Sequence, residues 1–166
     1  MLQGLPSPGA FDDADLTISV DGTLWYVTGQ NAFDVEPVWV SRSGTATAVK
    51  AGWSRRFTYP ELSPDGTRVA FGAEIGNETQ LWIRRLDKST EAIFTREGAV
   101  NFRPSWSSDG RSVAYISDRG RNYDILVQPA DQSAQPKLLL GRDSEMSIWE
   151  VVYPRSGPQS RLQGRS

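Results

Sequence analysis

The sequence predicts an all-β protein built from repeated four-stranded antiparallel sheets. Three Asp-Gly pairs, which begin at Asp21, Asp65 and Asp109, stand 44 residues apart. The surrounding residues repeat with the same spacing, so that 59–71 (YPELSPDGTRVAF) corresponds to 103–115 (RPSWSSDGRSVAY). No segment shows the sustained apolar period of about 3.6 residues that an amphipathic helix requires. A period of this length indicates a fold assembled from repeated supersecondary units.

The second unit shows the expected order of strands and turns most clearly. Asp65-Gly66 predicts a tight turn, because Gly takes a positive φ readily and Asp accepts hydrogen bonds from the neighbouring backbone. Segments rich in β-branched and aromatic residues predict strands at 69–71, 81–83 and 92–94. Polar, turn-forming residues at 76–79 and 87–90 separate these strands.

The remaining units carry the same pattern less completely. In the third unit 125–127 stands where the second has 81–83, and the first unit is a looser copy that holds 16–22 and 38–40. A fourth copy begins at 149–153. Four short strands in about 44 residues match one blade of a β-propeller, whose sheet must stack on neighbouring blades to bury both faces.

These repeats divide the chain into consecutive blades. We expect a leader or strand remnant at 1–14, blades at 15–58, 59–102 and 103–146, the start of a degenerate blade at 147–153, and a disordered tail at 154–166. The tail contains a single apolar side chain, Leu162, and cannot supply the strands that follow the turn in the other units. We therefore expect a partial propeller, either an open arc with exposed apolar end faces or a ring completed by self-association.

The composition limits the chemistry that the chain can perform. It contains no His and no Cys, which removes the commonest general base, the commonest metal ligand and any thiolate nucleophile. Its 18 basic and 20 acidic residues give a net charge of −2, which does not favour nucleic-acid binding. We predict no enzymatic activity, no cofactor and no metal site.

The expected location depends on the parent protein. No apolar run approaches the ~18 residues of a membrane-spanning helix, and the first residues lack the pattern of a signal peptide. From this sequence by itself we expect a cytoplasmic location. If the chain derives from a longer protein, we expect the periplasm or another extracytoplasmic space.

Several segments resemble a known family. Residues 63–71 (SPDGTRVAF), 104–110 (PSWSSDG) and 116–125 (ISDRGRNYDI) are similar to the WD-repeat-like units of TolB-like β-propellers. Segments 20–27 and 38–44 look closest to the propeller tails of bacterial membrane serine/threonine kinases. The resemblance implies four-stranded blades over roughly residues 15–153. It leaves the function open, because the same repeat occurs in Tol-Pal envelope proteins, in peptidase propellers and in kinase tails.

Candidate binding residues lie where one blade joins the next. In a propeller these connections reach the axial face, and loops there commonly bind partners. Arginine and aromatic side chains are enriched in interface hot spots. The candidates that meet these criteria are Arg55, Arg56, Tyr59, Asn101, Arg103 and Trp149. The alternative is that they are ordinary loop residues, with Phe57 and Phe102 packing between blades.

Other polar and aromatic residues have a structural interpretation that we favour. Asp21, Asp65 and Asp109 are expected to cap turns rather than bind metal. Asp118 and Asp124 are expected in a network with Ser117 or Arg119 rather than around a cation, since hard cations take six to eight oxygen ligands. The tryptophans that fall at core strand positions are Trp39, Trp82 and Trp106.

Two functions from different classes follow. The first is a non-enzymatic scaffold or sensor-type module that binds a protein or peptide. The alternative is the accessory propeller of a hydrolase or of a carbohydrate-active lyase or hydrolase. The missing His and the turn-bound carboxylates favour the first.

Overall fold

A computed structural model describes residues 16–18, 24–31, 34–50, 52–54, 56–120 and 123–141. In this part of the chain twelve strands form three four-stranded antiparallel sheets, and there is no helix. Within each sheet the strands pair in the order in which they follow along the chain. The predicted all-β fold with four-stranded sheets is therefore confirmed.

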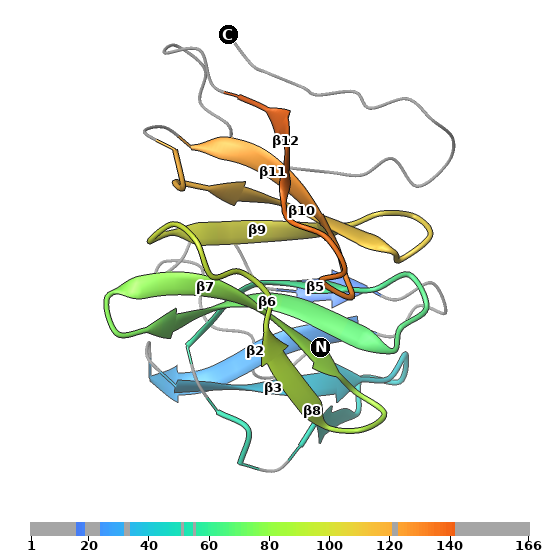
Figure 1. The fold of residues 1–166 in the computed structure, drawn as a ribbon. Coiled ribbons are helices and arrows are strands. Elements are labelled where there is room, and N and C mark those ends of the chain that lie inside the picture. Colours follow the sequence, from blue (N-terminus) through green and yellow to red (C-terminus); the bar gives the residue numbers. More distant parts are fainter. Residues whose placement is uncertain are drawn as a thin grey trace, which may run out of the picture.

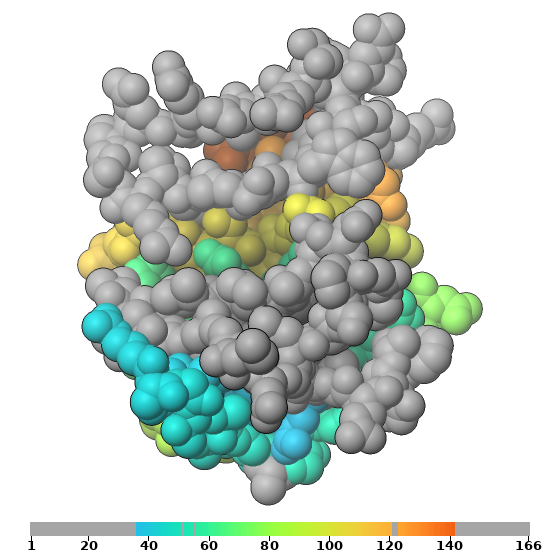
Figure 2. Space-filling model, turned by 180° about the vertical axis from the view of Figure 1, so that it is seen from behind, coloured from blue at the N-terminus to red at the C-terminus, as the bar shows by residue number. Residues whose placement is uncertain are grey.

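The three sheets follow one another along the sequence and stack face to face (Figure 1). The first contains β1 (Leu16–Ile18), β2 (Leu24–Asn31), β3 (Asp34–Val40) and β4 (Ala46–Ala48). The second contains β5 (Phe57–Leu62), β6 (Arg68–Ile75), β7 (Glu78–Arg85) and β8 (Thr90–Ile93). The third contains β9 (Asn101–Trp106), β10 (Ser112–Ser117), β11 (Asp124–Pro129) and β12 (Lys137–Leu140). Seen from behind, the cyan residues of the first sheet and the orange residues of the third lie toward opposite ends of the molecule (Figure 2).

Two of the expected blade boundaries fall inside strands. The second sheet begins at Phe57 and the third at Asn101, two residues before the expected starts at 59 and 103. The spacing of 44 residues is retained, but Pro60 and Pro104 resemble strand breakers in the sequence and hide the first residues of each strand. The other expected boundaries, at 14/15, 146/147 and 153/154, lie outside the described residues.

The Asp-Gly turns of the second and third sheets are built as predicted. Oδ1 of Asp109 accepts hydrogen bonds from the Ser107 hydroxyl, 2.7 Å away, and from the backbone N–H of Arg111, 3.0 Å away. These hydrogen bonds hold the pKa of Asp109 below its usual value. Gly110 has φ +67°, which a residue with a side chain rarely adopts. Asp65 accepts the equivalent bond from Thr67, at 3.0 Å. Asp21 lies outside the described residues.

The hydrophobic core lies between the sheets, because β6 and β10 alternate side chains toward both neighbours. Val69 and Phe71 of β6 pack in the cluster that includes Trp53 and Phe57, against which Trp39 of the first sheet packs. Ala70, from the opposite face of β6, joins the cluster between the second and third sheets. That cluster also contains Val113, which corresponds to Val69 in the repeat. Its remaining buried residues are Leu81, Phe94, Trp106, Tyr115 and Leu126. Trp39 and Trp82 are partly buried and Trp106 is buried, so all three tryptophans pack as predicted.

Polar contacts join the second and third sheets at the end that carries the Asp-Gly turns. The Arg68 guanidinium donates a hydrogen bond to the carbonyl oxygen of Gly110, 2.7 Å away, and lies 4.6 Å from the centre of the Trp106 ring. The Trp106 indole N–H in turn donates to the carbonyl oxygen of Glu61 across 2.9 Å. These contacts fix the third sheet against the second.

Apolar side chains of the third sheet differ in exposure. Ala114, Ile116 and Ile125, on the face that points away from the second sheet, are fully buried, whereas Leu138 and Leu139 of β12 keep 60% and 52% of their surface exposed. The open arc and the ring completed by self-association both stay predictions. Within the described residues, no helix has the length and apolar character needed to cross a membrane.

Candidate binding pocket between the second and third sheets

The first strands of the second and third sheets contain the same β-bulge. In β5, Tyr59 and Pro60 together stand opposite a single residue of β6, because the pairing shifts between Thr58 and Glu61. In β9, Arg103 and Pro104 form the same irregularity opposite β10. Proline lacks the N–H that a regular ladder needs, and a bulge on an edge strand accommodates it.

Each bulge places the residue before proline in an unusual backbone conformation. Tyr59 has φ +49° and Arg103 has φ +51°, in the left-handed region that costs about 1–2 kcal/mol for a residue with a side chain. The Arg103 guanidinium lies over the Tyr59 ring, 4.6 Å from its centre. Strained residues of this kind cluster at functional sites. Among the described residues Ser89 and Gln132 also have a positive φ, but they lie in the connections before β8 and β12, whereas Tyr59 and Arg103 lie within strands.

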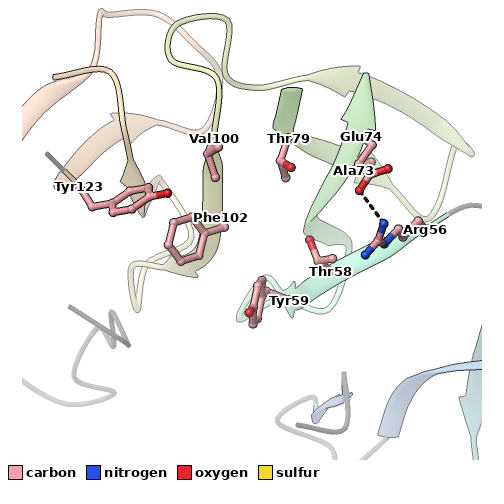
Figure 3. A pocket seen from close by; sticks show the side chains of 9 residues that line it. All are labelled: Arg56, Thr58, Tyr59, Ala73, Glu74, Thr79, Val100, Phe102 and Tyr123. Atoms are coloured by element: carbon pink, nitrogen blue, oxygen red, sulfur yellow. Dashed lines mark hydrogen bonds and ion pairs between the residues drawn. The ribbon is translucent and has the colours of Figure 1, made fainter. Parts of the chain in front are cut away.

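A pocket of about 290 Å³ opens beside this pair (Figure 3). The second sheet and the segment before it contribute one wall and the third sheet contributes the other. The lining residues are Arg56, Thr58, Tyr59, Ala73, Glu74, Thr79, Val100, Phe102 and Tyr123. The volume is at the small end of the range for ligand pockets, which is about 300–1,000 Å³. It therefore suits one side chain or a small ring.

Aromatic rings form a row along the pocket. Phe102 and Tyr123 meet edge to face with their centres 5.5 Å apart, and Tyr59 lies 6.1 Å from Phe102. Tyr123 keeps 38% of its surface exposed. Rings in this arrangement offer large contact area at a small cost in side-chain entropy.

The charged groups of the lining neutralise each other. Nη1 of Arg56 lies 2.8 Å from Oε1 of Glu74, and both side chains are about half exposed (Figure 3). Such an exposed pair contributes little to stability. It leaves the pocket without net charge.

A buried polar network holds the chain that leads into the third sheet. Asn101 donates from Nδ2 to Oε1 of Gln80 and to the carbonyl oxygen of Glu97, each at 3.0 Å. Gln80 donates from Nε2 to the carbonyl oxygen of Gly98, and the Thr95 hydroxyl donates to Gln80 across 2.6 Å. Because Asn101 and Gln80 are buried, this network positions the neighbouring pocket residues rather than contacting a ligand.

A second set of contacts fixes Val100, which lines the pocket. Its N–H donates to Oδ1 of Asp118 across 2.8 Å, and its carbonyl oxygen accepts from the Asp118 N–H. Gly98 allows this approach, since a Cβ there would lie 2.8 Å from Asp118 Oδ1. Asp118 thus bonds to the backbone of Val100, whereas the expected network was with Ser117 or Arg119. Among the described residues, no three acidic side chains gather as a metal site would require.

The six candidate residues have different positions in the structure. Arg56 and Tyr59 line the pocket, and Arg103 packs on Tyr59 beside it. Asn101 is fully buried, so the expectation that it lines the binding face is not met. Its place at the start of β9 turns its amide inward to Gln80. Arg55 and Trp149 lie outside the described residues.

Seven lining residues were not among the candidates. They are Thr58, Ala73, Glu74, Thr79, Val100, Phe102 and Tyr123. Phe102, which was expected to pack between blades, packs on the third sheet's own cluster of Ala114, Ile116 and Ile125, and its ring lies 6.1 Å from that of Tyr59 in the second sheet. The sequence did contain a signal that could have identified some of these residues. At the 44-residue spacing Thr58 corresponds to Phe102 and Thr79 to Tyr123, so side-chain size differs between the two repeats at these positions.

No protein-family model matches this chain. It is 29% identical over 92 residues to the Tol-Pal system protein TolB of Thioalkalivibrio sulfidiphilus, covering 55% of this chain and 19% of that protein. It is 34% identical over 68 residues to the uncharacterized peptidase YuxL of Bacillus subtilis, covering 37% of this chain and 10% of that protein. The chain therefore spans a fifth or less of the length of these relatives.

Solved structures agree with the sheet topology. A putative TolB from Agrobacterium tumefaciens superposes with a TM-score of 0.68 at 21% identity, over 81% of this chain and 48% of that one. An oligogalacturonate lyase in complex with manganese gives a TM-score of 0.56 at 15% identity, over 75% of this chain and 40% of that one. The fold is that of β-propeller blades. At these identities the similarity shows the fold alone, and the closer similarity to kinase tails stays a prediction.

Proposed function

We propose that this chain is a non-enzymatic β-propeller module that binds a protein or peptide partner at the face that carries Tyr59 and Arg103. The observation that carries the proposal is the pocket beside them, which has three aromatic side chains in its lining. An aromatic anchor site flanked by arginine is typical of interface hot spots. Similarity to Tol-Pal system proteins supports a protein partner, and it supports the periplasmic alternative for the location.

The accessory propeller of a hydrolase or lyase is the second candidate. Similarity to the peptidase supports it, as similarity to TolB supports binding. Against catalysis, the carboxylates of the described turns are bonded to backbone N–H groups. Glu74, the one carboxylate in the pocket lining, is paired with Arg56. A glycosidase-type mechanism needs two converging carboxyl groups.

The test uses a displayed library of random peptides, selected on the wild-type chain. Peptides recovered from the selection are then measured against Tyr59→Ala/Arg103→Ala, which removes the paired ring and cation. The control is Arg85→Ala/Arg111→Ala, because these exposed arginines lie near the Asp-Gly turns, at the other ends of the strands. Binding should weaken by roughly tenfold or more in the site variant, as expected for hot-spot residues.

The outcome separates the candidates. Equal binding to all three proteins, or loss only in the control, contradicts the assignment of this face. Recovery of cleaved peptides, with cleavage abolished by Glu74→Gln, favours the enzyme instead.

A further inference from the structure

Three positions that are small in the second sheet are large in the third. Shifting by the repeat length of 44 residues places Thr58 on Phe102, Gly72 on Ile116 and Thr79 on Tyr123. The strand pairing agrees with this correspondence, since Thr58 pairs with Gly72 and Phe102 pairs with Ile116. The two sheets therefore hold different side chains in the same backbone frame.

In the third sheet the large side chains fill their own space. Phe102 contacts Tyr123 edge to face, and it also packs on the cluster that contains the fully buried Ile116. Phe102 and Tyr123 thus occupy with aromatic rings the positions that the two threonines hold in the second sheet.

In the second sheet the same region is left open. The Thr58 hydroxyl lies over Gly72, where a Cβ would overlap with it, and the Thr79 methyl group lies 3.6 Å from the same point. Both threonines therefore stay close to β6, and the pocket opens between them and the wall formed by Val100, Phe102 and Tyr123 (Figure 3). The pocket exists because the second sheet lacks the volume that the third sheet has.

We infer that this pocket receives one neutral aromatic side chain of the bound partner, which supplies the missing volume. The inference rests on the proposed function and specifies the chemistry of the partner. The pocket has residues of both sheets in its lining, three of them aromatic, so an inserted ring would gain apolar contacts with each sheet.

Charge supports a neutral ring rather than a charged side chain. The two charged lining residues are already paired with each other at 2.8 Å. A charged anchor would lose hydration in the pocket without gaining an unused opposite charge. A neutral ring has no charge to desolvate and can pack against Phe102 and Tyr123, which line the pocket.

The experiment uses p-cresol and indole as free analogues of the tyrosine and tryptophan side chains. Each is titrated into the isotope-labelled chain, and backbone amide shifts are recorded. We expect saturable shifts at Val100, Phe102 and Thr79, and weaker binding of benzoate, the charged analogue. Absence of saturable shifts for both neutral rings, or shifts that map elsewhere, overturns the inference.

The decisive variant copies the third sheet into the second. Thr58→Phe/Thr79→Tyr should fill the pocket, keep or raise the melting temperature, and weaken p-cresol binding by about tenfold or more. Thr90→Phe, on an exposed position of β8, is the matched control and should bind as wild type does. If the double variant does not fold, Tyr123→Ala removes the half-exposed wall and should weaken binding severalfold. A folded double variant that binds p-cresol as well as wild type contradicts the inference.

The two proposals fail differently. Selected peptides could bind the face that carries Tyr59 and Arg103, lack aromatic residues and still bind Thr58→Phe/Thr79→Tyr. In that case this face is the binding face, but the inference of an aromatic anchor is wrong. If p-cresol enters the pocket but no peptide is selected, the pocket accepts rings and partner binding is wrong.

Discussion

Replacing Gly98 with alanine is expected to destabilise the fold and to loosen one wall of the pocket. Gly98 has φ +82°, and a Cβ at this position would lie 2.8 Å from Asp118 Oδ1, 3.0 Å from the Arg119 nitrogen and 3.1 Å from Ser117 Oγ. The Arg119 nitrogen belongs to the backbone, and Asp118 Oδ1 already accepts a hydrogen bond from the Val100 N–H, so neither atom can move away without cost. The substitution therefore strains the local backbone and displaces Asp118 from the Val100 N–H.

The magnitude follows from these two effects. Placing alanine at a positive φ costs about 1–2 kcal/mol. Losing a hydrogen bond to a charged acceptor costs about 1.5–3 kcal/mol. The free energy of unfolding should therefore fall by about 2.5–5 kcal/mol, a large fraction of the stability of a domain.

Gly76 provides the matched control, because it has φ +62° and a Cβ there would meet nothing within 4 Å. Gly76→Ala should cost only the backbone term, about 1–2 kcal/mol. Urea unfolding of both variants measures the difference, and the amide shift of Val100 reports the loss of its bond to Asp118. If Gly98→Ala costs no more than Gly76→Ala, the contacts assigned to Gly98 do not hold the wall.

Two further predictions concern the turns and the contact between sheets. Because the Asp109 pKa is lowered in the folded state from its usual 3.8, its contribution is present above that value and is lost as the pH falls through the folded-state pKa. The stability of wild type should thus drop more steeply below pH 3.8 than that of Asp109→Asn, as acid unfolding monitored by circular dichroism will show, and equal slopes would contradict the bonding at this turn. Trp106→Phe keeps most of the packed ring but removes the bond to Glu61, so the free energy of unfolding should fall by about 1 kcal/mol or more, because the Glu61 carbonyl is left without that donor. Unchanged stability in urea would mean that this bond does not fix the third sheet on the second.

The sequence predicted the parts of the fold that depend on local chemistry. Asp109-Gly110 specifies its turn through bonds between close neighbours, and the repeat spacing reveals that the turn recurs. The second and third sheets begin two residues earlier than the sequence predicted. A residue followed by proline can end a strand or form a bulge within it, and only the pairing with the neighbouring strand shows that β5 and β9 contain bulges.

The candidate site was only partly predictable, because it depends on contacts distant in the sequence. Arg56 and Tyr59 were selected from their residue types and their position between blades, and both line the pocket. Asn101 was selected by the same criteria, yet its amide bonds to Gln80, 21 residues earlier, and is buried. No local pattern distinguishes an asparagine that faces solvent from one that joins such a network.

The pocket illustrates how a repeat fold acquires a specific site without changing its backbone. The first three strands pair in the same register in the second and third sheets, including the bulges at Tyr59 and Arg103, and only the fourth strands pair differently. What differs is side-chain volume at corresponding positions, with Thr58 where the third sheet has Phe102. Because hydrogen bonding of the backbone does not depend on those side chains, a blade can lose volume at one position and keep its fold through the rest of its core. If the proposed aromatic anchor is right, differences in side-chain volume between repeats, rather than the repeated residues, position the binding site of this propeller.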